Sequence, residues 1–137
     1  MQNPDLARDY IRRARIRLQT LDLLFEAESW ADVVRESQEI VELSLKALLR
    51  SRGIDPPRVH DVSEVLLAEE NRMPEALVGD LRKLSEISRA LRRDRELAFY
   101  GAEDLTPSGF YSMQDAEEAR LGARQTVDSV EPHVVGG

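Results

Sequence analysis

Cysteine is absent from the 137-residue sequence, and histidine occurs only twice, as His60 and His133. The lack of cysteine excludes disulfide bridges, thiolate metal sites and cysteine nucleophiles. With only two histidines, a histidine-rich metal site and paired-histidine catalysis are nearly excluded as well. No spacing of acidic residues is typical of a metal site, and no glycine-rich phosphate loop is present. We therefore expect neither a metal nor another cofactor.

Long apolar segments are also missing. No apolar run is long enough to cross a bilayer, so the sequence predicts no transmembrane helix and no membrane partner. The stretch from Met1 to Asp9 lacks the charged and then apolar pattern of a signal peptide. We expect an intracellular, cytoplasmic protein.

Charge is abundant but unevenly distributed. The net charge of −7 argues against a general nucleic-acid coat protein. Between Arg82 and Glu96, however, there are six basic residues and three acidic ones, whereas between Glu103 and Glu131 there are two basic and seven acidic ones. Seventeen of the nineteen basic residues are arginine, which suits phosphate contacts, although biased codon usage is the simpler explanation. One cationic helix is therefore the best candidate contact surface.

The apolar residues recur at helical spacing, and no stretch alternates as a strand does. Capping signals predict helices that begin near five residues: Pro4, Ser29, Asp61, Pro74 and Ser112. The helix from Ser29 is predicted to end at Gly53, and the helix from Pro74 to run unbroken to Gly101. Residues 102–111 are predicted to form an ordered loop that packs back through three anchors: Leu105, Phe110 and Tyr111.

Helices joined by short connections pack antiparallel. The sequence therefore predicts an all-α fold, an up-and-down four-helix bundle with an additional short helix. The length suits a single domain, which we place at residues 1–131, and we expect residues 132–137 to be a frayed tail that includes His133.

Three segments in order resemble HEPN domains, small all-helical domains named for nucleotide binding in higher eukaryotes and prokaryotes. The segment AESWADVVRESQEIVELSLKALL, residues 27–49, is similar to their second helix. Gly53 followed by Val-His-Asp-Val at residues 59–62 is similar to the opening of their third helix. The segment RELAFYG, residues 95–101, with Pro107 and Tyr111 after it, is similar to the end of the fourth helix in a bacterial and archaeal subgroup. The resemblance covers residues 5–130.

The resemblance implies a helical bundle that forms a homodimer, with one of two kinds of activity. Many HEPN domains are metal-independent RNA endonucleases, whose motif is an arginine followed, after four to six residues, by a histidine. Others lack this motif; they pair with small nucleotidyltransferase proteins in toxin–antitoxin-like systems, or act as non-catalytic binding modules.

The nuclease motif lacks its histidine in this chain. After Arg95 and four intervening residues comes Tyr100 rather than a histidine. Spacings of four to six residues from Arg92 or Arg93 reach no histidine either. Imidazole, with a pKa of about 6.5, exchanges protons near neutral pH, whereas a phenol, with a pKa of about 10, is poorly matched to that task. We therefore expect RNA cleavage to be absent or unusual. If it occurs, the candidate catalytic residues are Arg95 with Tyr100 or His60.

Each of these candidates also has a structural interpretation. An inward Arg95 would pair with a glutamate of the second helix, where three are available: Glu36, Glu39 and Glu42. Tyr100 is better suited to anchor the helix end than to act as an acid or base. His60, directly before the Asp61 cap, is more typical of a residue that bonds to a backbone group.

Two functions remain from the sequence, with a third that is purely structural. The first is a non-catalytic module that binds nucleotide or RNA through Arg92, Arg93 and Arg95 and is paired with a nucleotidyltransferase. The alternative is a divergent metal-independent ribonuclease with a degenerate Arg-x4-Tyr motif. A dimer whose only role is assembly would require a second apolar face on the bundle.

Overall fold

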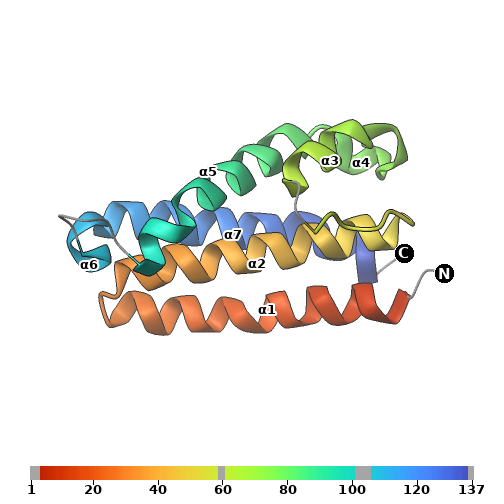
Figure 1. Ribbon diagram of the computed structural model, residues 1–137. Helices are drawn as coiled ribbons and strands as arrows, with labels where there is room; N and C mark the ends of the chain where they lie inside the picture. Colours follow the sequence, from red (N-terminus) through yellow and green to blue (C-terminus); the bar gives the residue numbers. More distant parts are fainter. Residues whose placement is uncertain (1–3, 59–60, 101–105, 136–137) are drawn as a thin grey trace.

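The computed structural model describes residues 4–58, 61–100 and 106–135, and for residues 93–100, 107, 108 and 135 it describes the backbone alone. Four long helices dominate this part of the chain (Figure 1): α1 (Pro4–Glu26), α2 (Trp30–Ser51), α5 (Leu81–Tyr100) and α7 (Met113–Val135). Shorter elements connect them: α3 (Val62–Ala68), the 3-10 turn η1 (Glu70–Arg72), α4 (Glu75–Val78) and α6 (Pro107–Phe110). The described residues contain no strand, and the predicted all-α class is confirmed.

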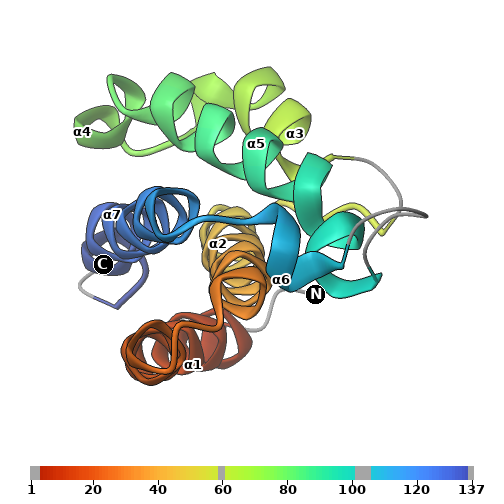
Figure 2. The same ribbon diagram turned by 90° about the vertical axis from the view of Figure 1, so that its left-hand side faces the viewer.

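Consecutive long helices run in opposite directions, as predicted for an up-and-down bundle (Figure 1). The central helix is α2, which contacts α1, α7 and α5. Helices α1, α2 and α7 lie side by side, whereas α5 crosses them at a slant (Figures 1 and 2). The beginning of α5 packs against α3. In both views α1 and α5 lie on opposite sides of α2, so that these two helices present separate surfaces.

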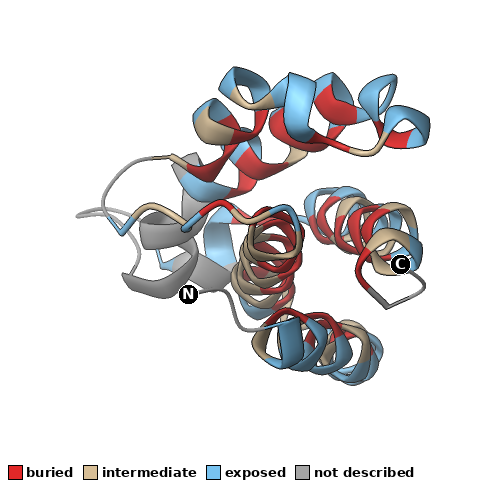
Figure 3. Cartoon of the chain, turned by 90° about the vertical axis from the view of Figure 1, so that its right-hand side faces the viewer, coloured by how far each residue is buried: buried red, intermediate tan, exposed pale blue. Residues whose placement is uncertain are grey.

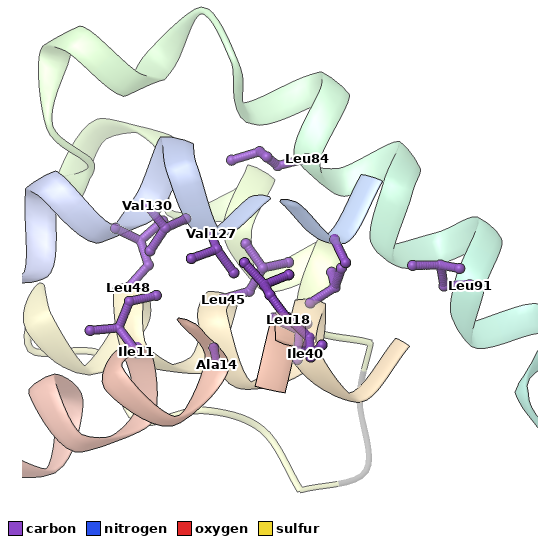
Figure 4. Close-up of a cluster of buried hydrophobic side chains, with 14 of the residues drawn as sticks. Ile11, Ala14, Leu18, Ile40, Leu45, Leu48, Leu84, Leu91, Val127 and Val130 are labelled. Carbon is purple, nitrogen blue, oxygen red and sulfur yellow. The ribbon is translucent and has the colours of Figure 1, made fainter. Parts of the chain in front are cut away.

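The core lies where these helices meet α2, and the buried residues form stripes on the inward sides of the helices (Figure 3). Ile40, Leu45 and Leu48 of α2 are fully buried at its centre. Side chains from the other helices converge on them in Figure 4: Ile11, Ala14, Leu18, Leu84, Leu91, Val127 and Val130. Each large aliphatic side chain buried in this way stabilises the fold by about 1.5–3 kcal/mol, so burial of apolar surface holds the bundle together.

Several helix ends follow the local signals in the sequence. The Asp61 carboxylate accepts a hydrogen bond from the Ser63 amide at 2.9 Å and caps α3. Gly53, just beyond α2, has a φ of +77°, a conformation that favours glycine. At the start of α7 the Ser112 hydroxyl accepts from the Asp115 amide, while the Asp115 carboxylate accepts from the Ser112 amide. The Ser29 hydroxyl, in contrast, makes no capping hydrogen bond to the backbone at the start of α2 and donates to the Asp32 side chain.

The helix predicted from Pro74 to Gly101 is interrupted. α4 ends at Val78 and α5 begins at Leu81, with Gly79 and Asp80 between them in a turn. Glycine is a poor helix former, and the Asp80 amide bonds to the Leu77 carbonyl in a tighter turn than an α-helix has. The predicted apolar stripe nevertheless continues across the break, because Leu77 and Leu81 are both buried.

The prediction of a frayed tail from residue 132 is wrong for residues 132–135, which continue α7. Pro132 removes one backbone hydrogen bond from this last turn. Val134 is only 6% exposed and extends the buried stripe of Val127 and Val130, so packing outweighs the local cost of the proline. His133 lies in this last turn of the helix.

Residues 102–111 were predicted to form an ordered loop with three anchors. Pro107–Phe110 instead form the short helix α6. Tyr111 is buried, as predicted, but Phe110 is 44% exposed and packs edge-on against the Tyr111 ring. Leu105 lies outside the described residues. Of the two anchors that can be placed, only Tyr111 is held in the core.

Candidate functional site

The cationic segment predicted from the sequence lies on α5. Four of its basic side chains are described, and all four are exposed: Arg82, Lys83, Arg89 and Arg92. None of the four forms an ion pair or a hydrogen bond with a residue that the structure describes. The charges of Arg82, Lys83 and Arg89 are therefore available to an external anion, while Arg92 lies in the field of the Glu42 carboxylate.

Several arginines elsewhere in the bundle are engaged within the chain. Arg15 of α1 donates to Asp128 at 2.9 Å and to Glu131 at 2.6 Å, which joins α1 to the end of α7. The hydrogen bond to Glu131 raises the pKa of Arg15, although desolvation opposes this effect. Arg120 of α7 lies 3.3 Å from Asp22 and stacks over the Phe25 ring. Compared with these internally paired cations, α5 carries a concentration of free positive charge.

The spacing of the α5 cations places them along the helix. Arg82 and Arg89 are seven residues apart and therefore lie on the same face, two turns from each other. Arg92 follows nearly one turn later. The eleven residues from Arg82 to Arg92 extend over about 15 Å at the rise of an α-helix. This length matches several phosphates of a nucleic-acid strand, whose successive nucleotides are about 3.4 Å apart.

A polar cluster on α2 lies beside Arg92. The Glu42 carboxylate accepts from the Gln38 amide at 3.0 Å and lies 3.2 Å from the Lys46 ammonium. Burial raises the pKa of Glu42, but the bond from Gln38 and the charges of Lys46 and Arg92 outweigh it, so that the pKa lies below its usual value. Gln38 itself is only 4% exposed, and its Oε1 has no hydrogen-bond partner among the described residues. Glu42 is therefore a charged neighbour of Arg92 at neutral pH.

Only part of the predicted site can be placed. Arg92 is exposed on α5, as a phosphate-binding residue requires. The side chains of Arg93, Arg95 and Tyr100 lie outside the described residues, as does His60 entirely. The backbone of α5 extends through Tyr100, which places Arg95 and Tyr100 in the last turns of the same helix.

The glutamates predicted as partners for Arg95 face different neighbours. Glu36 and Glu39 accept hydrogen bonds from Arg17 of α1 at 2.8 Å and 2.6 Å. Glu42, on another side of α2, is the carboxylate that interacts with Arg92. The pairing of Arg17 with Glu36 and Glu39 is not predictable from the sequence, because it depends on which faces of α1 and α2 meet.

The described residues include no group of three or more histidine, aspartate or glutamate side chains that could hold a metal ion. Of the helices in the described ranges, none is both long and apolar enough to cross a membrane. The chemistry present on α5 is that of guanidinium and ammonium groups, which hold phosphate oxygens through hydrogen bonds and charge.

Comparison with known proteins adds one finding. A family model described as the HEPN domain matches residues 7–132, nearly the whole chain. Searches of curated proteins and of solved structures found no match.

Proposed function

The chain belongs to the HEPN domain family, and we propose that it is a non-catalytic member that binds nucleotide or RNA phosphate through α5. The observation that carries the proposal is the group of four exposed α5 cations that form no ion pair or hydrogen bond with a described residue: Arg82, Lys83, Arg89 and Arg92. Arg93 and Arg95, farther along the same helix, extend this surface in the proposal.

The sequence of α5 supports the absence of RNA cleavage. Four residues separate Arg95 from Tyr100, which stands where the motif has its histidine, and no histidine lies at the family spacing from any arginine of this helix. An arginine can still hold a phosphate and stabilise its charge, but it does not move protons near neutral pH. Binding without efficient cleavage is the activity that such a surface supports.

The test is a binding titration with a fluorescently labelled single-stranded RNA, read by anisotropy. The variant Arg82→Glu/Arg89→Glu reverses two free charges on the α5 surface, and we expect it to weaken binding about tenfold or more. Arg12→Glu is the control, because Arg12 is exposed on α1, on the far side of α2. Equal affinity of the α5 variant and the wild type would contradict the proposal.

The same samples distinguish binding from cleavage. We expect the RNA to remain intact on a denaturing gel after incubation without metal. Cleavage by the wild type that is lost in Arg95→Ala would establish the divergent ribonuclease instead. Cleavage that is equal in both proteins would point to a contaminating nuclease.

We infer further that the module works as a homodimer beside a separately encoded nucleotidyltransferase, as in toxin–antitoxin-like systems. The support is the family resemblance combined with the missing motif histidine. Co-expression with a nucleotidyltransferase encoded next to this chain, followed by size-exclusion chromatography, tests both parts. Failure to form a complex would contradict the pairing, and a monomer at micromolar concentration would contradict the dimer.

A further inference from the structure

A groove of about 430 Å³ lies between α5 and α7. Val34 of α2 and the ring of Tyr111 line it as well. Five further lining residues are apolar or lack a side chain: Ile87, Ala90, Leu91, Ala119 and Gly122. The groove is thus bounded by two long helices and based on the central one, with apolar side chains among its lining residues.

Acidic side chains predominate among the charged residues of this groove. Three carboxylates and one ammonium line it: Glu86, Asp115, Glu118 and Lys83. Asp115 is committed to the cap of α7, and Glu118 accepts only a long bond of 3.4 Å from Gln114. Glu86 has no partner among the residues that the structure describes. Lys83 belongs to both surfaces, but the arginines proposed to bind phosphate do not line the groove, so the two surfaces differ in their predominant charge.

The walls permit close approach by another backbone. Ala90, Ala119 and Gly122 present little or no side chain. At Gly122 the two helices are already in close contact, because a Cβ there would lie 3.1 Å from the Cγ2 atom of Ile87. The slant of α5 keeps most of its length away from α7, and the two helices share few contacts (Figures 1 and 2). The groove lies between these two helices.

We propose that the α5–α7 groove docks an amphipathic helix of a partner protein, whose apolar face enters the groove while lysine or arginine side chains along its flanks meet Glu86 and Glu118. An apolar base with an acidic border fits this chemistry, because such helices bind by apolar anchors and gain specificity from complementary charge. A phosphate-bearing ligand is disfavoured, since it would meet a border with two more negative charges than positive ones. This inference does not depend on RNA binding.

The experiment uses a synthetic helical peptide of leucine and lysine, about 18 residues or five turns long, with all leucines on one face. A peptide of the same composition in scrambled order controls for net charge. Ala90→Trp fills the groove from a position that is exposed in the fold. Glu86→Lys/Glu118→Lys reverses two negative charges at the border of the groove. Glu64→Lys/Glu75→Lys is the matched control, since both residues are exposed on other helices and the change in net charge is the same.

We expect the patterned peptide to bind the wild type better than the scrambled one. Ala90→Trp and the border variant should each weaken binding about tenfold or more, while the matched control stays within about twofold. Equal binding of the two peptides, or equal loss in the control, would overturn the proposal. A change in the oligomeric state of Ala90→Trp without peptide would also overturn it, because the occupant would then be a second copy of the chain. Circular dichroism establishes that each variant is folded.

Discussion

At the scale of single residues, Arg17 is the main ionic link between α1 and α2. Its guanidinium donates to both oxygens of Glu36 and to Glu39, and the Glu36 side chain is only 12% exposed. The hydrogen bond to Glu36 raises the pKa of Arg17 despite the opposing effect of desolvation. Among the described residues Glu36 depends on this cation, whereas Glu39 also lies 3.7 Å from the Arg35 guanidinium.

Arg17→Ala should lower the free energy of unfolding by about 1–3 kcal/mol, because it leaves the largely buried Glu36 carboxylate without its donor. Urea denaturation measures the change. Arg8→Ala is the control: it breaks an ion pair with Asp5 in which both side chains are more than half exposed, and we expect little effect. Equal losses of unfolding free energy in Arg17→Ala and Arg8→Ala would show that the burial of Glu36 does not strengthen its ion pair.

Glu42 makes the stability of the protein depend on pH in a defined direction. Its pKa is lower in the folded protein than in the unfolded chain, so its contribution is complete above the unfolded value of about 4.3. That contribution is lost as the pH falls through the lower folded value. The difference in unfolding free energy between wild type and Glu42→Gln should therefore shrink as the pH is lowered below about 4.3. Urea denaturation at a series of pH values measures it, and a difference that does not vary with pH would contradict the role of Glu42.

At the scale of elements, two serines precede helices but only one caps its helix. Ser112→Ala removes the hydroxyl that accepts from the Asp115 amide, and we expect it to cost about 1 kcal/mol. Ser29→Ala removes only a hydrogen bond to the Asp32 side chain and should cost clearly less. Thermal unfolding of the two variants provides the comparison. A larger loss of stability in Ser29→Ala than in Ser112→Ala would contradict this difference between the two serines.

Two glycines beside helices should respond to alanine in opposite ways. Gly53 has a φ of +77°, so Gly53→Ala should destabilise the protein by about 1 kcal/mol. Gly79 has an α-helical conformation, and a Cβ there would meet no atom within 4 Å. Gly79→Ala should therefore stabilise the protein by about 0.4–1 kcal/mol. Chemical denaturation of both variants measures whether the free energy of unfolding falls in Gly53→Ala and rises in Gly79→Ala.

The elements show which parts of the fold local sequence can predict. Gly53, Asp61 and Ser112 mark helix boundaries correctly, because capping depends on a few adjacent residues. The end of α7 could not be predicted in this way. Its continuation past Pro132 depends on burial of Val134 against distant helices, and no local rule includes that contact.

At the scale of the whole molecule, the alternating helix directions were predictable, because short connections force neighbouring helices to be antiparallel. The slant of α5 was not, since it depends on how α3 packs against the beginning of that helix. The free cations of α5 were predictable from charge along the sequence. The α5–α7 groove and the pairing of Arg17 with Glu36 were not, because both depend on which helix faces meet.

The distribution of charge over the molecule determines how RNA binding should respond to salt. The chain carries a net charge of −7, so the proposed attraction to RNA would come from the local surface of α5 rather than from the protein as a whole. Each phosphate neutralised on a single strand contributes about −0.7 to the slope of log K against log salt.

The central claim, that α5 holds phosphates, is tested most directly by this salt dependence in the wild type and in Arg82→Ala/Arg89→Ala/Arg92→Ala. If all three side chains contact phosphates, the variant's slope should be smaller in magnitude by about 2. Arg12→Ala should keep the slope of the wild type. Identical slopes for the wild type and the triple variant would contradict the claim.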